Sequence, residues 1–178
     1  RDADLVSAAD LVACQATFNE GSRTFFAASF LLPRAIRRDA SALYAFCRMA
    51  DDAVDRGSGG DETLDRLADR LDRIYAGRPL AVPSDRAFAD VVARRGIPRA
   101  LLDALLEGFA WDAAGRRYET LPEVLDYAAR VAGTVGAMMA VIMDRRAPAT
   151  RRPPPRRSAR RSAHAPRRTR GASAQRRR

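Results

Sequence analysis

The sequence has no lysine, and all 32 of its basic residues are arginine. These arginines are unevenly distributed. Residues 1–144 hold 18 arginines and all 22 acidic residues, a net charge of −4, whereas residues 145–178 hold 14 arginines and no acid, a net charge of +14. The isoelectric point of about 11.1 therefore describes the end of the chain. It does not indicate that residues 1–144 bind nucleic acid.

Long apolar runs and cysteines are also scarce. The longest run, residues 131–143, has 13 residues including two glycines, fewer than the roughly 20 that a membrane-spanning helix needs. We therefore expect no transmembrane helix. No apolar segment follows Arg1, so we expect no signal peptide, a true start upstream and a cytoplasmic protein. Cys14 and Cys47 are expected to be buried thiols, because a disulfide is rare in a reducing compartment.

Strand patterns are missing before residue 144. Apolar residues there recur at steps of three and four, and no segment alternates with β-branched residues. The sequence therefore predicts an all-α domain. Glycine and proline breaks separate its helices, which we expect at residues 4–19, 22–32, 35–56, 61–76, 84–95, 98–115 and 121–143.

Residues 145–178 differ sharply in composition from the rest of the chain. They contain 14 Arg, 7 Ala and 5 Pro, and no large aliphatic or aromatic residue, so they have little apolar surface to offset the entropy cost of ordering. We expect a partial helical domain over 1–144 and a disordered basic tail over 145–178. Because Arg, Pro and Ala are typical of GC-rich DNA read out of frame, our hypothesis is a frameshift near codon 144.

A pair of acids follows an aromatic, apolar segment. Asp51 and Asp55 are four residues apart, so on a helix they share a face and repel each other. A divalent cation would relieve that repulsion, and carboxylate oxygen is the ligand type that Mg²⁺ prefers. Arg48, one turn before Asp51, could then bind a phosphate oxygen. The alternative for such a pair alone is a solvated surface; the preceding Leu43, Tyr44 and Phe46 favour a site at the edge of a buried face.

The same spacing occurs elsewhere in the chain. Asp61, Asp65 and Asp69 repeat it, but Arg66, Arg70 and Arg73 are close enough to neutralise them. Leucines recur on one face of this segment, and acid-to-base pairs recur at four-residue steps. We therefore expect the helix at 61–76 to be structural.

Two further segments each allow two interpretations. Ser22 lies at an expected helix start. The simpler interpretation is that Ser22 is an N-cap, and the alternative is that it forms an anion site together with Arg23 and Thr24. Gly133, Gly136 and Ala140 put small residues on one side of the last helix. That side could lie along a flexible hydrocarbon beside methionines, but we favour close helix packing.

In order and spacing, these segments resemble the squalene and phytoene synthase family. The resemblance covers about residues 10–143. It rests on Ser22-Arg23-Thr24-Phe25 with Leu31-Leu32-Pro33, on residues 42–48 leading to Asp51-Asp52-Ala53-Val54-Asp55, and on residues 127–142. The sequence of residues 106–112 is most similar to that of bacterial family members from carotenoid pathways.

The resemblance implies an isoprenoid synthase fold and the head-to-head condensation of two geranylgeranyl diphosphates to phytoene. It also implies Mg²⁺, with Mn²⁺ as a substitute, held by Asp51 and Asp55. The catalytic group that it implies is Asp51, Asp55, Arg48, Tyr44, Asp112 and Tyr127. The substrate contacts that it implies are Ser22, Arg23, Thr24, Phe25, Val131, Gly133 and Gly136.

The chain departs from the family pattern after Asp144. The family's second aspartate-rich helix should follow there, but residues 145–178 contain no acid, so we expect little activity from this polypeptide. One alternative is a squalene or dehydrosqualene synthase acting on farnesyl diphosphate. Another is a non-enzymatic fragment whose tail binds nucleic acid or anionic membrane. Residues 145–178 contain no aromatic residue, so we do not expect specific nucleic-acid binding. We do expect peripheral contact with the inner membrane.

Overall fold

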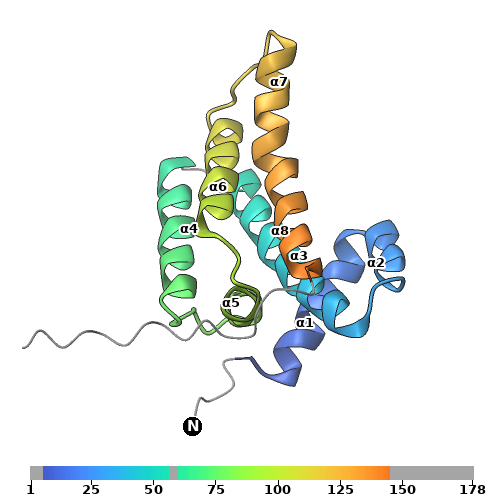
Figure 1. Ribbon diagram of the computed structural model, residues 1–178. Helices are drawn as coiled ribbons and strands as arrows, with labels where there is room; N and C mark the ends of the chain where they lie inside the picture. Colours follow the sequence, from blue (N-terminus) through green and yellow to red (C-terminus); the bar gives the residue numbers. More distant parts are fainter. Residues whose placement is uncertain (1–5, 57–59, 145–178) are drawn as a thin grey trace, which may run out of the picture.

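A computed structural model describes residues 6–56 and 60–144, and every regular element within those ranges is a helix. Figure 1 shows most of the helices packed side by side, with residues 83–95 seen end-on below them and residues 121–128 projecting above the rest. This confirms the all-α prediction for the described residues. The elements are α1 (Ala8–Gly21), α2 (Arg23–Ser29), α3 (Arg34–Arg56), α4 (Gly60–Tyr75), α5 (Pro83–Arg95), α6 (Arg99–Ala113), α7 (Leu121–Ala128), the π-helical segment η1 (Ala129–Gly133) and α8 (Thr134–Met143). The expected disorder of 145–178 lies outside the described residues.

All seven expected helical segments are present, but the first, second and sixth are shorter than expected. The first begins at Ala8 because Ser7 caps it: the Ser7 hydroxyl accepts a hydrogen bond from the Asp10 backbone N–H at 3.1 Å, and the Asp10 carboxylate accepts one from the Ser7 N–H at 2.9 Å. This reciprocal pair satisfies N–H groups that would otherwise lack partners. The second helix ends at Ser29, and a turn through Leu31 leads to Pro33.

The helix expected at 121–143 is continuous but contains an irregular turn. Residues 129–133 are π-helical, and the Thr134 hydroxyl donates to the Arg130 carbonyl at 2.5 Å. Such insertions shift the faces of the helix on either side and occur often at functional sites. The periodicity of the sequence predicted the helix and did not indicate this turn.

The core forms around α3, which contacts α1, α4, α5, α6 and α8. Its inward face carries Leu43 and Phe46, and the Phe46 ring stacks on Phe88 of α5 with 4.7 Å between ring centroids. Met138 and Ile142 of α8 are fully buried against the same cluster. The hydrophobic effect on these apolar faces therefore fixes α3 between α5 and α8.

Buried ion pairs fasten α5 to its neighbours. Asp10 of α1 accepts two hydrogen bonds from Arg86, Asp39 of α3 binds both Arg94 and Arg95, and Asp85 accepts two hydrogen bonds from Arg70 of α4. The three carboxylates are almost completely buried. The Arg86 guanidinium holds the pKa of Asp10 well below its usual range, although burial opposes this. Sequence spacing did not predict these pairs, because most of them join residues more than 50 positions apart.

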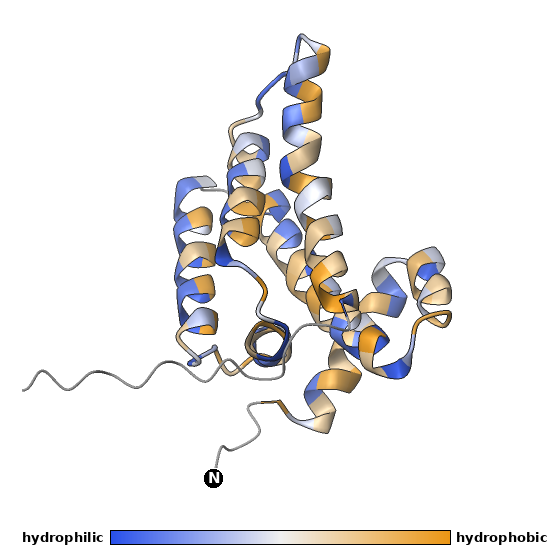
Figure 2. Cartoon of the chain, in the orientation of Figure 1, coloured by the Kyte–Doolittle hydropathy of each residue, from blue (hydrophilic) through white to orange (hydrophobic). Residues whose placement is uncertain are grey.

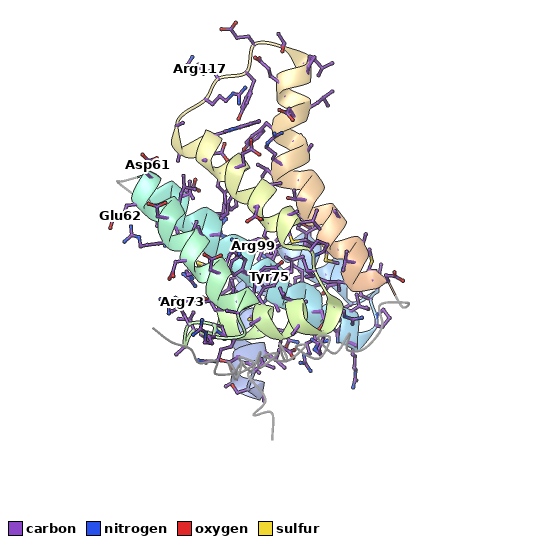
Figure 3. The ribbon with its side chains drawn as sticks, turned by 60° about the vertical axis from the view of Figure 1, so that its left-hand side comes forward. Asp61, Glu62, Arg73, Tyr75, Arg99 and Arg117 are labelled. Carbon is purple, nitrogen blue, oxygen red and sulfur yellow. The ribbon has the colours of Figure 1, made fainter. Side chains whose placement is uncertain are left out.

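Helix α4 is structural, as expected. Leu67, Leu71 and Ile74 are buried, and the predicted pairs Glu62–Arg66 and Asp69–Arg73 are present at 3.7 and 2.7 Å. Figure 3 shows Asp61 and Glu62 at its N-terminal end and Arg73 near its other end, the arrangement that favours the helix dipole. In the same view Tyr75 lies beside Arg99, whose guanidinium is 5.4 Å from the centre of the Tyr75 ring.

The expectation of no membrane-length helix was wrong as to length and composition. The continuous helix Leu121–Met143 is long and apolar enough to cross a membrane, with a mean hydropathy of 1.3, and 17 % of its most apolar stretch is buried. Counting one unbroken run missed this, because Arg130 interrupts the run without making the whole helix polar. The helix nevertheless packs against α6 through η1 and α8, and its inner side belongs to the core.

Candidate active site

One face of α3 carries the residues that the sequence singled out. Tyr44, Arg48, Asp51 and Asp55 are spaced by four, three and four residues, so they form one stripe along the helix. The stripe starts beside the core and runs outward: Tyr44 and Asp51 are partly buried, whereas Arg48 and Asp55 are exposed. The amphipathic pattern of α3 thus positions the acids at the rim of the apolar interior.

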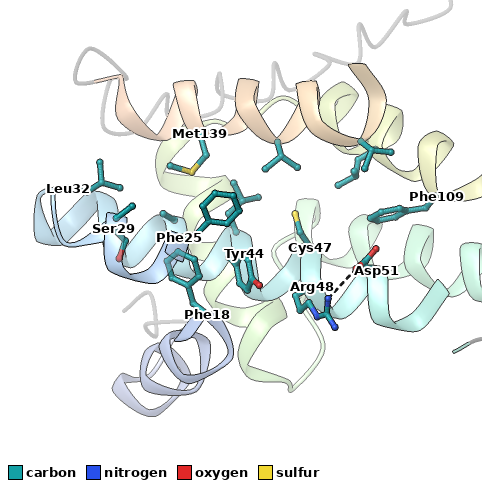
Figure 4. A pocket seen from close by; sticks show the side chains of 16 residues that line it. Phe18, Phe25, Ser29, Leu32, Tyr44, Cys47, Arg48, Asp51, Phe109 and Met139 are labelled. Atoms are coloured by element: carbon teal, nitrogen blue, oxygen red, sulfur yellow. Dashed lines mark ion pairs between the residues drawn. The ribbon is translucent and has the colours of Figure 1, made fainter. Parts of the chain in front are cut away.

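This stripe forms one wall of a cavity of about 600 Å³. Figure 4 shows Arg48 and Asp51 toward one end of the cavity and Leu32 toward the other, with Met139 reaching in from the opposite wall. The cavity therefore has a charged end and a long apolar body. Its wall comprises Phe18, Phe25, Ala28, Ser29, Leu32, Ala40, Leu43, Tyr44, Cys47, Arg48, Asp51, Leu105, Phe109, Val131, Val135 and Met139.

The charges at the polar end are only partly balanced. Arg48 lies 2.7 Å from Asp52 and 3.5 Å from Asp51, so its closer partner is Asp52, which also pairs with Arg56 at 2.7 Å. Among the described residues, no ion pair involves Asp55. Burial raises the pKa of Asp51, Asp55 raises it further, and Arg48 opposes them. Asp51 therefore carries its negative charge at a cost that a cation would relieve.

A second acid reaches this end from α6. The Tyr127 hydroxyl donates to the Asp112 carboxylate at 2.9 Å, and the charge of Asp112 contributes to the raised pKa of Asp51. Burial and the hydrogen bond to Asp112 raise the pKa of Tyr127 to about 12, so its phenol stays protonated at neutral pH. The structure thus brings Asp51, Asp112 and Tyr127 from three separate helices into one electrostatic neighbourhood.

The acids that could hold a metal ion here are a pair of carboxylates, Asp51 and Asp55. No group of three or more His, Cys, Asp or Glu side chains is arranged to hold a metal ion within residues 6–56 and 60–144. Asp51 and Asp55 could offer two oxygen ligands, and Mg²⁺ commonly takes its remaining ligands from water and substrate phosphates. The donor set and the uncompensated charge therefore fit a magnesium ion that is shared with a phosphate ligand.

The Ser22 segment behaves as the simpler interpretation predicted. Ser22 is the N-cap of α2, and its hydroxyl accepts from the Phe25 backbone N–H at 3.4 Å. Arg23 and Thr24 are exposed, and of this segment only Phe25 lines the cavity. The geometry therefore places Phe25 at the cavity and leaves Ser22, Arg23 and Thr24 outside its wall.

The interpretation of the small residues as a packing surface was wrong. Gly133, Gly136 and Ala140 are exposed, and a methyl group built on Gly136 would meet nothing within 4 Å. Their face points away from the helices that the structure describes. The close approach lies elsewhere, at Gly108 of α6, where a methyl group would come within 2.7 Å of the Val131 side chain.

Several wall residues were not predicted as site residues. Leu105 and Phe109 of α6 and Met139 of α8 face the cavity, and their helical spacing predicted burial without indicating which cavity they face. Cys47 also lies on the wall, where burial raises the pKa of its thiol to about 12. It is therefore a neutral wall residue rather than a nucleophile. Both cysteines are free thiols, as expected, but only Cys14 is fully buried and Cys47 is partly exposed.

Comparison with known proteins gives the same picture. The sequence pattern of the squalene/phytoene synthase family matches residues 18–167. The phytoene synthases of Cereibacter sphaeroides and Rhodobacter capsulatus are 52 % and 54 % identical over 154 and 147 residues, which is 81 % of this chain and 43 % of each relative. The chain thus spans less than half the length of these curated relatives.

Solved structures agree in fold. A crystal structure of a dehydrosqualene synthase superposes with a TM-score of 0.69 at 30 % identity, covering 75 % of this chain and 47 % of that one. The squalene synthase HpnC from Alicyclobacillus acidocaldarius also gives a TM-score of 0.69, at 28 % identity, and the match covers 75 % of this chain and 51 % of that one. The helical fold, the cavity with charge at one end and the sequence matches agree, and the chain belongs to the squalene/phytoene synthase family.

Proposed function

We propose that the cavity binds a prenyl diphosphate and that the complete enzyme to which these helices belong is a phytoene synthase. It would join two geranylgeranyl diphosphates through a cyclopropyl diphosphate. The observation that carries this proposal is the shape of the cavity, which has charge at one end and apolar walls along the rest. That is the polarity of a prenyl diphosphate, and the relatives named phytoene synthase direct the choice of reaction.

Each part of the cavity has a chemical task in this proposal. Arg48 can turn from Asp52 to a diphosphate oxygen, because both are anionic acceptors. The apolar walls, including Phe109 and Met139, exclude water, which would otherwise capture a carbocation. Tyr127 lies outside the cavity wall; its protonated phenol holds the Asp112 carboxylate, whose charge acts on Asp51 at the charged end.

Magnesium, or manganese in its place, would be held by Asp51 and Asp55. When bound, the metal neutralises charge on the departing diphosphate. The two aspartates contribute negative charge. Arg48 balances this charge only in part, because its guanidinium lies 3.5 Å from the Asp51 carboxylate.

Dehydrosqualene or squalene formation from farnesyl diphosphate is the second candidate. The named solved structures favour it, whereas the relatives with higher sequence identity favour phytoene. The length of the hydrocarbon product separates the two. We place the protein in the cytoplasm, in peripheral contact with the membrane that holds such hydrocarbons. The alternative of a tail that binds nucleic acid concerns residues outside the described ranges.

The test is a product assay with geranylgeranyl diphosphate and Mg²⁺. We expect negligible phytoene from the 178-residue polypeptide, because no group of three or more acidic, His or Cys side chains is arranged to hold a metal ion within residues 6–56 and 60–144. Losing roughly 4 kcal/mol of charge stabilisation slows a reaction about a thousandfold. A chimera in which the C-terminal part of the Rhodobacter capsulatus enzyme follows residue 144 should form phytoene. Condensation of farnesyl diphosphate, offered in a parallel assay, without condensation of geranylgeranyl diphosphate would contradict the proposal, as would no product from the chimera.

A further inference from the structure

The turn from α2 into α3 exposes large apolar side chains. Leu31 is 90 % exposed, Phe25 67 % and Phe30 60 %. Figure 2 shows this turn as a hydrophobic stretch that runs directly into the hydrophilic start of α3. We call Phe25, Phe30, Leu31 and the arginines beside them the corner surface. Exposed apolar side chains that gather in this way mark a contact surface.

The corner surface is basic and lacks acids of its own. Residues 21–38 contain Arg23, Arg34, Arg37 and Arg38 and no Asp or Glu. Arg38 binds Asp90 of α5 at 3.0 Å, but no ion pair among the described residues involves the other three. The Arg37 guanidinium lies 4.7 Å from the centre of the Phe30 ring. The aromatic and cationic groups therefore share one surface.

A second exposed apolar group provides a contrast. Leu121 and Leu125 at the tip of α7 are 69 % and 59 % exposed, similar to Phe25 and Phe30. Their sequence neighbours Glu119, Glu123 and Asp126 are acidic. The two apolar groups are thus comparable in exposure and opposite in the charge that accompanies them.

We propose that the corner surface docks the protein on an anionic lipid bilayer, with Leu31 and Phe30 inserted among the acyl chains and Arg23, Arg34 and Arg37 at the phosphate groups. Apolar insertion and attraction to anionic lipid together give reversible membrane binding. Long arginine side chains reach headgroups while their stems stay in apolar surroundings. A second copy of the chain fits less well, because a two-fold interface would set these arginines against their own copies.

Docking there would also orient the cavity. Phe25 belongs to both the corner surface and the cavity wall, and Ala28, Ser29 and Leu32 from the same segment line the wall as well. An apolar ligand could then pass between bilayer and cavity with little exposure to water. The docking itself does not depend on the proposed reaction and is tested without any substrate.

Vesicle flotation of the full chain tests the proposal. On vesicles of phosphatidylcholine with phosphatidylglycerol, Leu31→Asp should weaken binding about tenfold, because a buried leucine is lost and an anion is introduced. The matched change Leu125→Asp should leave binding unchanged. Residues 145–178 are identical in both variants, so their charge cannot produce a difference between them. Equal effects of the two substitutions would overturn the proposal.

A contact measurement identifies the inserted residue directly. Leu31→Trp should gain fluorescence quenching by lipids brominated in their acyl chains, over the background of Trp111, whereas Leu125→Trp should not. Quenching that stays at the background level for Leu31→Trp would overturn the proposal. So would sedimentation that shows self-association through the corner surface, abolished by Leu31→Asp, without any binding to vesicles.

Discussion

Gly108 sets the distance between α6 and the π-helical segment. A methyl group at this position would lie 2.7 Å from the Val131 side chain and 3.2 Å from Cβ of Arg130. Both of those residues belong to η1, and Val131 also lines the cavity. The absence of a side chain at Gly108 therefore allows α6 and η1 to pack closely where Val131 lines the cavity.

We expect Gly108→Ala to lower the free energy of unfolding by about 1–3 kcal/mol, since an overpacked contact costs this much. The matched change Gly136→Ala meets nothing within 4 Å and should raise it by about 0.5–1 kcal/mol, because alanine is the better helix former. Urea unfolding followed by circular dichroism measures both. Equal destabilisation by the two changes would show that the exposed small-residue face is in fact packed.

Asp51 is the residue whose charge state the site depends on. Burial and Asp55 raise its pKa above the ordinary 3.8, and Arg48 lowers it. We expect Asp55→Asn to lower the pKa of Asp51 and Arg48→Gln to raise it, as followed by NMR of the carboxyl carbon. Because a raised pKa makes the ionised form costly in the folded state, Asp51→Asn should be neutral or stabilise at pH 7 by up to about 0.5 kcal/mol. A pKa of Asp51 at or below 3.8 in the native chain would contradict this.

Helix α5 is the element held most by charge. Its arginines Arg86, Arg94 and Arg95 bind buried carboxylates on α1 and α3, and its own Asp85 accepts from α4. A buried carboxylate without its partner is expensive. The contacts of α5 with α1, α3 and α4 therefore depend on pairs that act together with apolar packing.

Asp10→Asn should lower the free energy of unfolding at pH 7 by about 2–3 kcal/mol, because it leaves Arg86 without its charged partner. The pKa of Asp10 is depressed in the folded state, so the stability that it contributes is complete above about pH 4 and is lost as the pH falls below that. The gap between Asp10→Asn and the native chain should therefore narrow in acid. Asp69→Asn, which breaks the exposed pair with Arg73 at 2.7 Å, is the control and should cost at most about 0.5 kcal/mol. A gap independent of pH would contradict the pairing.

The helices were predictable from the sequence because their apolar residues recur with the helical period. The ends of the helices were predictable only where a glycine, a proline or a capping residue stands in the sequence next to the end. The start of α1 depended on a reciprocal cap between Ser7 and Asp10, and the π-helical turn at 129–133 left no mark in the periodicity. The stripe from Tyr44 to Asp51 was predictable because one helix carries it. The family resemblance named Tyr127 and Asp112 as site residues but did not predict the hydrogen bond between them. The buried pairs of α5 were not predicted either, because tertiary packing decides both.

At the scale of the whole molecule, the helices form a cavity that is charged at one end and apolar along its body (Figure 4). Helix α3 supplies the acids, α6 and η1 supply one apolar wall, and α2 supplies another beside the corner surface. The face of α7 and α8 that carries Gly136 is exposed. The family match and the cavity together make prenyl diphosphate binding the central claim about this chain.

Calorimetric titration with a non-reacting thiodiphosphate analogue of geranylgeranyl diphosphate tests that claim most directly. The native chain should bind the analogue only with Mg²⁺ present. Asp51→Asn and Asp55→Asn should each weaken binding about tenfold or more, since each removes a charged ligand of the metal. Asp65→Asn, on the exposed face of α4, should leave the affinity unchanged. Binding that does not require Mg²⁺, or equal effects of all three substitutions, would contradict the assignment of Asp51 and Asp55 as the metal-holding pair.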